Sequence, residues 1–231
     1  MRWIAFTIPD PPPDWPAAIS YKRRLSDFFA EESAEGGITF DLRVKKTEGS
    51  IRQAFLDLRR QKPLEKITVK ELCQRAEIHK STFYSHYEDL YALSDALETQ
   101  VVEQVIFGLR HPEYVFERPA QFTRELFQGY RAQDERIQIL FSGSRAGRMV
   151  EKVEESVKQL VFRQHPEYAR NPDMHIFLSY TVYGGYHAYI RSRDLPREQV
   201  VELISQLSER GKELLDQRAG RSAPLAPEER G

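Results

Sequence analysis

The stretch 68–87, TVKELCQRAEIHKSTFYSHY, constrains the fold of this chain more than any other. Thr68 has the side chain of a helix N-cap, and Glu71 stands where a capping box places a carboxylate that bonds back to the capping amide. The apolar residues fall on one helix face, break register and resume on another. We therefore predict two short helices, joined by a sharp turn, on one small core. The residues expected to face this core are Leu72, Cys73, Ala76, Ile78, Phe83 and Tyr87.

The second predicted helix, residues 80–87, has an outward face of one cation, several hydroxyls, an aromatic edge and an imidazole. Such groups suit base edges and phosphate oxygens, and helix-turn-helix geometry places the second helix in the major groove of double-stranded DNA. The alternative is a solvated surface helix without a partner. The residues predicted to contact DNA are Thr68, His79, Lys80, Ser81, Thr82, Tyr84, Ser85 and His86, together with Lys45 and Lys46 from a basic arm.

The charge of the chain is distributed unevenly. The whole sequence has a net charge of −1, whereas residues 42–86 contain eleven Lys and Arg against five Asp and Glu, a local charge of +6. A generally basic nucleic-acid coat is excluded, so any DNA footprint must lie in this segment.

Length and composition restrict the class of protein. A chain of 231 residues can bury a sizeable core without disulfides, and the single cysteine, Cys73, has no partner within the chain. No window is apolar enough to span a bilayer, and the apolar start of the chain is too short for a signal peptide. We expect a soluble, cytoplasmic protein with no membrane contact.

Proline and glycine divide the chain. Residues 1–40 are rich in Pro, Glu and Gly, and we expect a weakly ordered leader, absent from the native protein if translation begins near Asp41. A supporting helix is predicted over residues 47–61, capped by Thr47, and a long connecting helix runs from a cap at Asp89 to about Leu109. Further helices are predicted near 120–132, 135–142, 146–164, 174–193 and from Pro196. The tail 219–231 reads as disordered.

The last two predicted helices carry long apolar stripes. Gly184 and Gly185 lie in the middle of one of them, at about 1 kcal/mol each relative to Ala, which indicates close approach of another helix. We therefore predict a homodimer through these helices. The predicted interface residues are Tyr180, Gly184, His187, Leu203 and Leu207.

Aromatic residues are frequent in the same C-terminal region. They predict a cavity between helices for a small apolar or aromatic effector, although the same residues can simply fill a core. The predicted lining residues are Phe122, Phe127, Tyr130, Phe141, Phe162 and Tyr183.

An enzyme would need converging acids, bases or metal ligands, and these are sparse. Cys73 is expected to face the core while His86 faces outward, and His175 and His187 are roughly 18 Å apart along one helix. We predict no catalytic residue, no metal site and no cofactor.

With these features together, the sequence resembles the TetR family of bacterial transcription regulators. The likeness is strongest over residues 41–97, through the run ITVKELCQRAEIHKSTFYSHY, and covers the rest through its helical architecture and the ending YGGYHAYIRSRDLP. The resemblance implies an all-α fold in which a DNA-binding head, residues 41–89, joins a ligand-binding and dimerisation domain, residues 90–218. It also implies a ligand-responsive repressor that binds a palindromic operator as a dimer.

Two positions depart from the family pattern. Glu77 stands where the turn usually has Gly, which implies a less favourable backbone angle or a slightly different turn, at a cost of roughly 1 kcal/mol if the angle is left-handed. Leu90 stands where a Lys is usual, so the N-terminal amides of the following helix would have to supply that phosphate contact. Both departures favour the alternative of a TetR-like coactivator or sensor that binds a partner protein, whereas the positive segment 42–86 opposes it.

Overall fold

A computed structural model of the protein describes residues 42–222, with side chains from 46 to 218, and every element in this range is helical. The all-α prediction is confirmed for these residues. The predicted leader, residues 1–40, and the last part of the predicted tail, residues 223–231, lie outside the described range.

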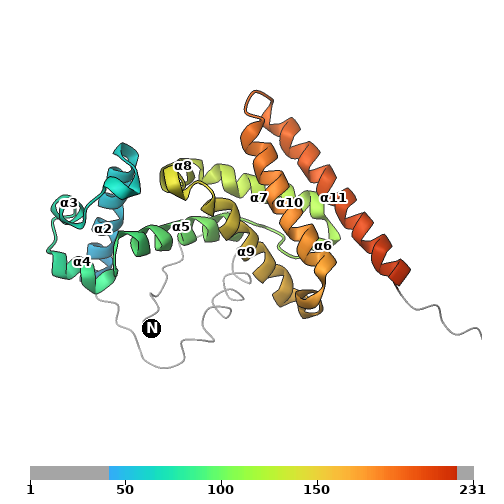
Figure 1. Ribbon diagram of the computed structural model, residues 1–231, viewed down its shortest axis with the longest axis horizontal. Helices are drawn as coiled ribbons and strands as arrows, with labels where there is room; N and C mark the ends of the chain where they lie inside the picture. The colour runs from blue at the N-terminus through green and yellow to red at the C-terminus, as the bar shows by residue number, and fades with distance from the viewer. Residues whose placement is uncertain (1–41, 223–231) are drawn as a thin grey trace, which may run out of the picture. The chain divides into compact units, whose positions relative to one another are not determined.

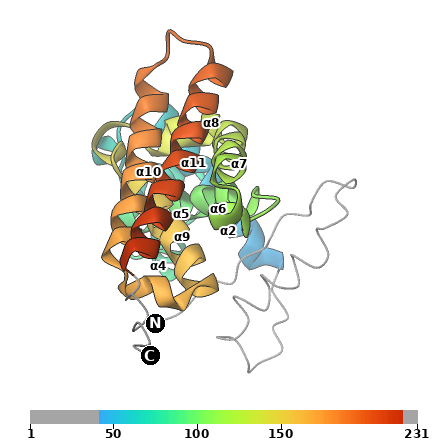
Figure 2. The same ribbon diagram turned by 90° about the vertical axis from the view of Figure 1, so that its right-hand side faces the viewer.

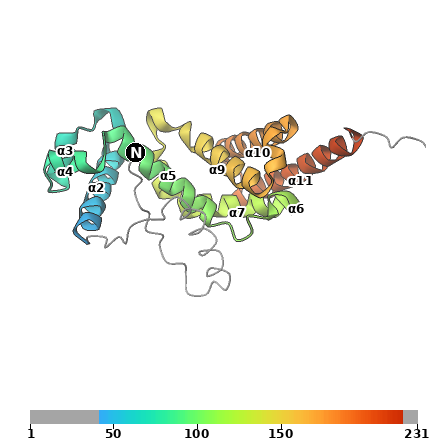
Figure 3. The ribbon, with the colours of Figure 1, turned by 90° about the horizontal axis from the view of Figure 1, so that it is seen from below.

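The first helices gather at the N-terminal end of α5 (Figure 1, Figure 3). Ile51, Phe55 and Leu58 of α2 are buried, as their helical spacing predicts. The helix is longer than expected and contains Thr47, because no Gly or Pro separates residues 42–46 from it. Thr47 is therefore not a cap. The elements of this part are α2 (Leu42–Gln61), η1 (Leu64–Lys66), α3 (Val69–Arg75) and α4 (Lys80–His86).

Helix α5 (Leu90–Phe107) begins at the predicted cap. The Asp89 carboxylate accepts a hydrogen bond of 2.7 Å from the Ala92 amide, which satisfies one of the free donors of the first turn. The predicted stripe on this helix is buried from end to end. Its members are Leu90, Leu93, Leu97, Val101 and Val105.

The remaining helices pack on α5 and on one another. Helix α5 contacts α7 and α9, α10 contacts α9, and α11 contacts α7 and α10. Figure 2 shows α10 and α11 side by side. Helix α11 continues past residue 219, where the tail was predicted to start, because the first helix-breaking proline beyond it is Pro224. The elements are α6 (Tyr114–Glu117), α7 (Pro119–Ala132), α8 (Asp134–Leu140), η2 (Gly143–Arg145), α9 (Arg148–Gln164), η3 (Pro166–Arg170), α10 (Pro172–Arg191) and α11 (Arg197–Ser222).

Candidate functional site

The turn between α3 and α4 has a defined hydrogen-bond pattern. The Ile78 amide donates to the Cys73 carbonyl at 3.0 Å, and the Glu77 amide donates to the Gln74 carbonyl at 3.4 Å. These two bonds make a Schellman motif, in which the residue after the C-cap adopts a left-handed angle. That residue is Glu77, with φ of 55°, so of the two expectations for this position the structure has the less favourable, left-handed angle. The turn fixes the direction in which α4 leaves α3.

The start of α3 agrees only partly with a capping box. The Thr68 hydroxyl oxygen accepts from the Glu71 amide at 3.2 Å, as predicted, and its proton stays available for another acceptor. The Glu71 carboxylate does not return to the Thr68 amide. It binds Lys62 Nζ at 2.6 and 2.7 Å instead, because the end of α2 brings that ammonium group within reach.

Helix α4 is anchored by its inner face. Phe83 is completely buried and Tyr87 nearly so, and their rings lie 6.1 Å apart. The outer face is open, with Tyr84 56% exposed. Because the buried rings hold the helix, its outward side chains project from a supported surface. Among the predicted contact residues, Thr68, His79, Lys80, Ser81, Tyr84 and Ser85 are exposed, and Thr82 and His86 are partly buried.

The hydroxyls on this face are not equivalent. Ser85 Oγ donates to the Thr82 carbonyl at 2.7 Å, so its proton is already used and its oxygen can only accept. No side chain within the described range bonds to Ser81 Oγ or to Thr82 Oγ1. Both hydroxyls can therefore donate as well as accept.

The cations around α3 and α4 fall into two groups. Arg52, Arg60, Lys62 and Arg75 each pair with a carboxylate of this segment. The second group is exposed and has no carboxylate within 4.0 Å in the described part of the chain, so its charge is uncompensated. Its members are Lys46, Lys66, Lys70 and Lys80. The side chain of Lys45 lies outside the described residues.

The N-terminus of α5 offers an anion fewer free amide donors than an uncapped helix N-terminus would. The Asp89 carboxylate occupies the Ala92 amide, and the Leu90 side chain is buried at 8% exposure. A phosphate at this end would meet the Asp89 carboxylate, and the apolar Leu90 beside it offers no cation.

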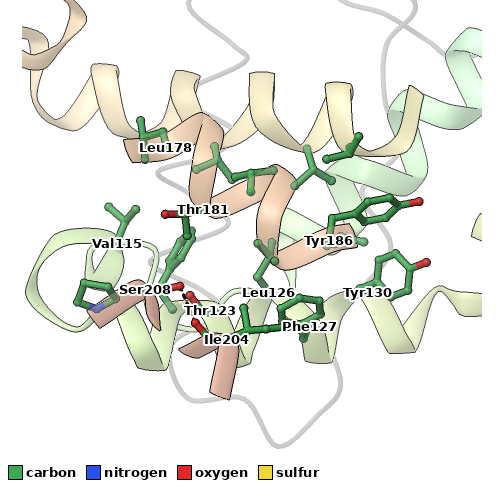
Figure 4. A pocket seen from close by; sticks show the side chains of 18 of the residues that line it. Val115, Thr123, Leu126, Phe127, Tyr130, Leu178, Thr181, Tyr186, Ile204 and Ser208 are labelled. Carbon is green, nitrogen blue, oxygen red and sulfur yellow. Dashed lines mark hydrogen bonds between the residues drawn. The ribbon is translucent and has the colours of Figure 1, made fainter. Parts of the chain in front are cut away.

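A second feature is a cavity of about 70 Å³ between α5, α6, α7, α9, α10 and α11 (Figure 4). Phe122, Phe127 and Tyr130 line it, as predicted. Three hydroxyl groups of the lining were not predicted from the sequence. Each lies within an apolar stripe of its helix, and a hydroxyl in such a stripe is the sequence signal that could have identified it. The three residues are Thr123, Thr181 and Ser208.

Three aromatic residues predicted for the cavity are not in its lining. Phe141 follows α8 and is buried elsewhere in the core, and Phe162 packs against the His175 ring at a centroid distance of 4.7 Å. Tyr183 lies near His187, with ring centroids 6.4 Å apart. Phe162 on α9 and Tyr183 on α10 point away from the lining residues of the same helices, such as Val157 and Thr181.

Helices α10 and α11 carry a row of exposed large apolar side chains. The two central glycines differ: a Cβ on Gly185 would lie 3.1 Å from Ile204 Cγ2, whereas one on Gly184 would meet nothing within 4 Å. Packing within the chain thus explains Gly185 and leaves Gly184 facing outward, beside the exposed His187. The exposed residues are Ile176, Tyr180, Leu203, Leu207 and Leu214, between 59% and 78% exposed.

A third feature, missed by sequence reasoning, is a set of charged side chains around two buried ones, Arg59 and Glu98. We name it the junction cluster, and its other members are Asp95, Arg145 and Arg148, of which Asp95 and Arg148 are partly exposed. Glu98 is completely buried and binds the Arg145 guanidinium through both oxygens at 2.7 Å. Asp95 binds Arg148 at 2.7 Å. No sequence signal points to these pairs, because the partners are about fifty residues apart.

Arg59 ties α2 to the end of α8. It is 4% exposed, and its Nη2 donates to the Leu140 carbonyl at 3.1 Å and to Ser142 Oγ at 2.9 Å. Its Nε has no partner. Burial lowers the pKa of the guanidinium, and the opposing charges of Glu65 and Glu98 do not fully offset it. Arg59 thus links α2 to the α8–α9 connection, and the exposed pair of Arg60 and Glu135 links α2 to α8 as well.

The described residues show no centre for metal or thiol chemistry. No three His, Cys, Asp or Glu side chains within the described range gather as metal ligands do. Cys73 is buried, and burial raises the pKa of its thiol, which opposes formation of a reactive thiolate.

Between residues 42 and 222, none of the helices combines the length and the apolar character that a membrane crossing requires. Comparison of the chain with protein families, with curated proteins and with solved structures finds no match.

Proposed function

We propose that the protein is a sequence-specific DNA-binding transcriptional regulator of the TetR kind. In this proposal α2, α3 and α4 form the helix-turn-helix head, α4 enters the major groove, and α5 joins the head to the ligand-binding and dimerisation domain. The protein acts in the cytoplasm on double-stranded operator DNA, and it needs neither a cofactor nor a catalytic residue.

The observation that carries the proposal is the outer face of α4. Buried Phe83 and Tyr87 hold the helix, so Lys80, Ser81 and Tyr84 are presented on a rigid element. Exposed lysines without carboxylate partners lie on the neighbouring α2, η1 and α3. Unpaired cations release counterions when they neutralise phosphates, and hydroxyl and aromatic edges can contact bases. A merely solvated helix requires no such concentration of uncompensated positive charge.

The exposed row on α10 and α11 supports a homodimer. Tyr180, Leu203 and Leu207 are each more than half exposed, and isolated monomers rarely leave large apolar side chains in such a row. A second copy that places the same row against it across a two-fold axis would build a four-helix interface. The two heads would then bind the two halves of a palindromic operator.

The dimer can be tested at Gly184, because open space surrounds it within the chain. Gly184→Leu fits the monomer, so it should leave the fold intact and weaken the dimer. Light scattering over a concentration series measures the change, with circular dichroism as the check on folding. A monomeric parent protein would contradict the proposed dimer.

The cavity supports a ligand-responsive repressor. An effector that prefers the conformation with misplaced heads would release DNA, with a coupling free energy of about 1 to 3 kcal/mol. The second candidate function, a coactivator that binds a partner protein, is favoured by Asp89 and Leu90 at the start of α5.

Selection from a random duplex pool decides between these functions. The full-length protein should enrich a palindromic sequence, and a partner-binding protein should enrich none. Fluorescence anisotropy on the selected duplex then compares two tyrosines of similar exposure, Tyr84 at 56% on α4 and Tyr91 at 50% on α5. Tyr84→Ala should weaken binding by about 1 to 3 kcal/mol and relax sequence preference, and Tyr91→Ala should change neither.

A further inference from the structure

The lining of the cavity contains no charged side chain. Hydrophobic residues supply most of the surface, and every polar contribution comes from a hydroxyl. An ion moved into such a site would lose its hydration without gaining a counter-charge. A carboxylate or ammonium ligand is therefore disfavoured, and an uncharged molecule fits.

Two of the hydroxyls have no hydrogen-bond partner within the described part of the chain. Thr123, only 7% exposed, and Thr181 both line the cavity, from α7 and α10. Ser208 Oγ donates to the Ile204 carbonyl at 3.0 Å and retains the capacity to accept. Neither threonine oxygen is among the fully buried unpaired atoms of the described residues, so both hydroxyls are open to the cavity, where each can donate to and accept from a bound group.

The hydroxyls are also placed asymmetrically. In Figure 4, Thr123, Thr181 and Ser208 are drawn towards one end of the cavity, and the rings of Tyr130 and Tyr186 towards the other. These two rings are 6.2 Å apart, and burial raises the pKa of the Tyr130 hydroxyl, so it stays neutral. The cavity thus has the threonine and serine hydroxyls at one end and two tyrosine rings, with their own hydroxyls, at the other.

From this asymmetry we infer that the cavity binds a small, uncharged, mostly apolar molecule with one hydroxyl or carbonyl group, which Thr123 and Thr181 bind. A volume of about 70 Å³ suits a compact molecule, because each water-sized group occupies roughly 15 Å³ by the same kind of measure. The effector role of this ligand rests on the proposed function. Its binding does not, since no DNA is needed to measure it.

A set of five-membered rings that differ in one substituent tests the inference on the full-length protein. The probes are cyclopentanol, cyclopentanone, methylcyclopentane, cyclopentylammonium and cyclopentanecarboxylate, with affinity measured by methyl NMR titration. Cyclopentanol and cyclopentanone should bind, and the two ions should bind at least about 100-fold more weakly because nothing in the lining compensates their charge. Equal binding of the ions, or no binding of the alcohol and the ketone, overturns the inference.

Isosteric variants test the hydroxyls. Thr123→Val and Thr181→Val each keep the side-chain shape, and each should weaken cyclopentanol about fivefold while leaving methylcyclopentane unchanged or tighter. Thr82→Val, on α4 and outside the cavity, is the matched control and should change neither affinity. If the double valine variant binds cyclopentanol as tightly as the parent, the assignment of the hydroxyls is wrong.

The same titration separates this inference from the proposed function. Binding that follows the expected order, in a protein that enriches no DNA sequence, leaves the ligand class standing and removes the regulator. If the protein enriches an operator but binds none of the neutral probes, the proposed regulator stands and the inferred ligand class is wrong.

Discussion

The junction cluster and the cavity bury polar groups in opposite ways. At the junction the groups are ionised and held by direct bonds, such as Glu98 with Arg145 at 2.7 Å through both oxygens. In the cavity the groups are neutral hydroxyls, and Thr123 and Thr181 have no partner in the described residues. A buried ion without a partner is too costly to keep, whereas a buried hydroxyl without one is tolerable.

This difference separates two tasks. The pair of Glu98 and Arg145 has one good arrangement, so it fixes how α5 and the α8–α9 connection meet. Arg59 adds α2 through its bonds to the Leu140 carbonyl and Ser142 Oγ. Unpaired hydroxyls leave room for an exchangeable molecule. The junction should therefore govern stability, and the cavity should govern ligand affinity with little effect on stability.

The largest expected effect is at Glu98. Glu98→Gln keeps the shape but leaves the Arg145 guanidinium, 13% exposed, with only the longer contact to Asp95 at 3.6 Å. The free energy of unfolding should fall by about 3 kcal/mol, measured by urea denaturation at fixed protein concentration. The control is Glu202→Gln, whose pair with Arg124 at 2.9 Å is half-exposed and should contribute less than about 1 kcal/mol. Equal losses of unfolding free energy in the two variants would contradict a larger contribution from the buried pair than from the exposed one.

Arg59 should follow. Arg59→Met removes the donors to the Leu140 carbonyl and to Ser142 Oγ, which keeps only its own bond to the Ile139 carbonyl, so the free energy of unfolding should fall by about 2 kcal/mol. The neighbouring Arg60 has exposed partners, and Arg60→Met should lower it by less than about 1 kcal/mol in the same urea titration. If Arg59→Met lowers the free energy of unfolding no more than Arg60→Met does, the Arg59 side chain does not hold α2 in place.

Glu103 on α5 sharpens the comparison, because it is partly buried but lacks a direct partner. Burial, opposed by the charge of Lys152, raises its pKa to about 6. Between pH 4.5 and 6 the folded state binds the proton more tightly than the unfolded state, so this group lowers stability as pH rises through that window. Glu103→Gln should stabilise the protein by roughly 1 kcal/mol at pH 7.5, after allowance for partial exposure, and by less at pH 5. Thermal melts of the parent and of Glu103→Gln at both pH values measure this stabilisation. A stabilisation that is larger at pH 5 than at pH 7.5 would contradict the prediction.

The smallest effect is expected in the cavity. Thr123→Val replaces an unpaired hydroxyl by a methyl group and should change the free energy of unfolding by no more than about 0.5 kcal/mol. Ser94→Ala is the contrast, because Ser94 Oγ donates to Glu98 at 2.7 Å where both are buried, and its loss should lower stability by about 1 to 2 kcal/mol. A destabilised Thr123→Val variant would mean that the hydroxyl has a structural partner.

Local chemistry explains which predictions from sequence hold. The Thr68 and Asp89 caps and the buried faces of α2 and α5 follow from spacing and from groups within one turn of each other, and they are confirmed. The left-handed angle at Glu77 is also local. Contacts between distant segments are not encoded in this way: Lys62 takes the Glu71 carboxylate, and Phe162 turns from the cavity towards His175.

The residues of the candidate site can be predicted from the sequence to the same extent as the fold. Helical spacing identified the outward residues of α4, because two short helices on one core leave few choices. It did not identify Thr123, Thr181 or the junction cluster, since a hydroxyl or a charge in an apolar stripe does not reveal which distant helix it meets. The predicted contacts with DNA and with a second copy stay predictions.

The salt dependence of operator affinity, measured for the parent and for Lys80→Ala, Thr82→Ala and Tyr84→Ala, tests the proposed DNA interface most directly. We expect each variant to bind the selected duplex more weakly. If Lys80 meets a phosphate, Lys80→Ala should also lower the slope of log affinity against log salt by about one unit per half-site, and if it meets a base, it should change preference at one position instead. Unchanged affinity of all three variants at several salt concentrations would contradict DNA binding by α4.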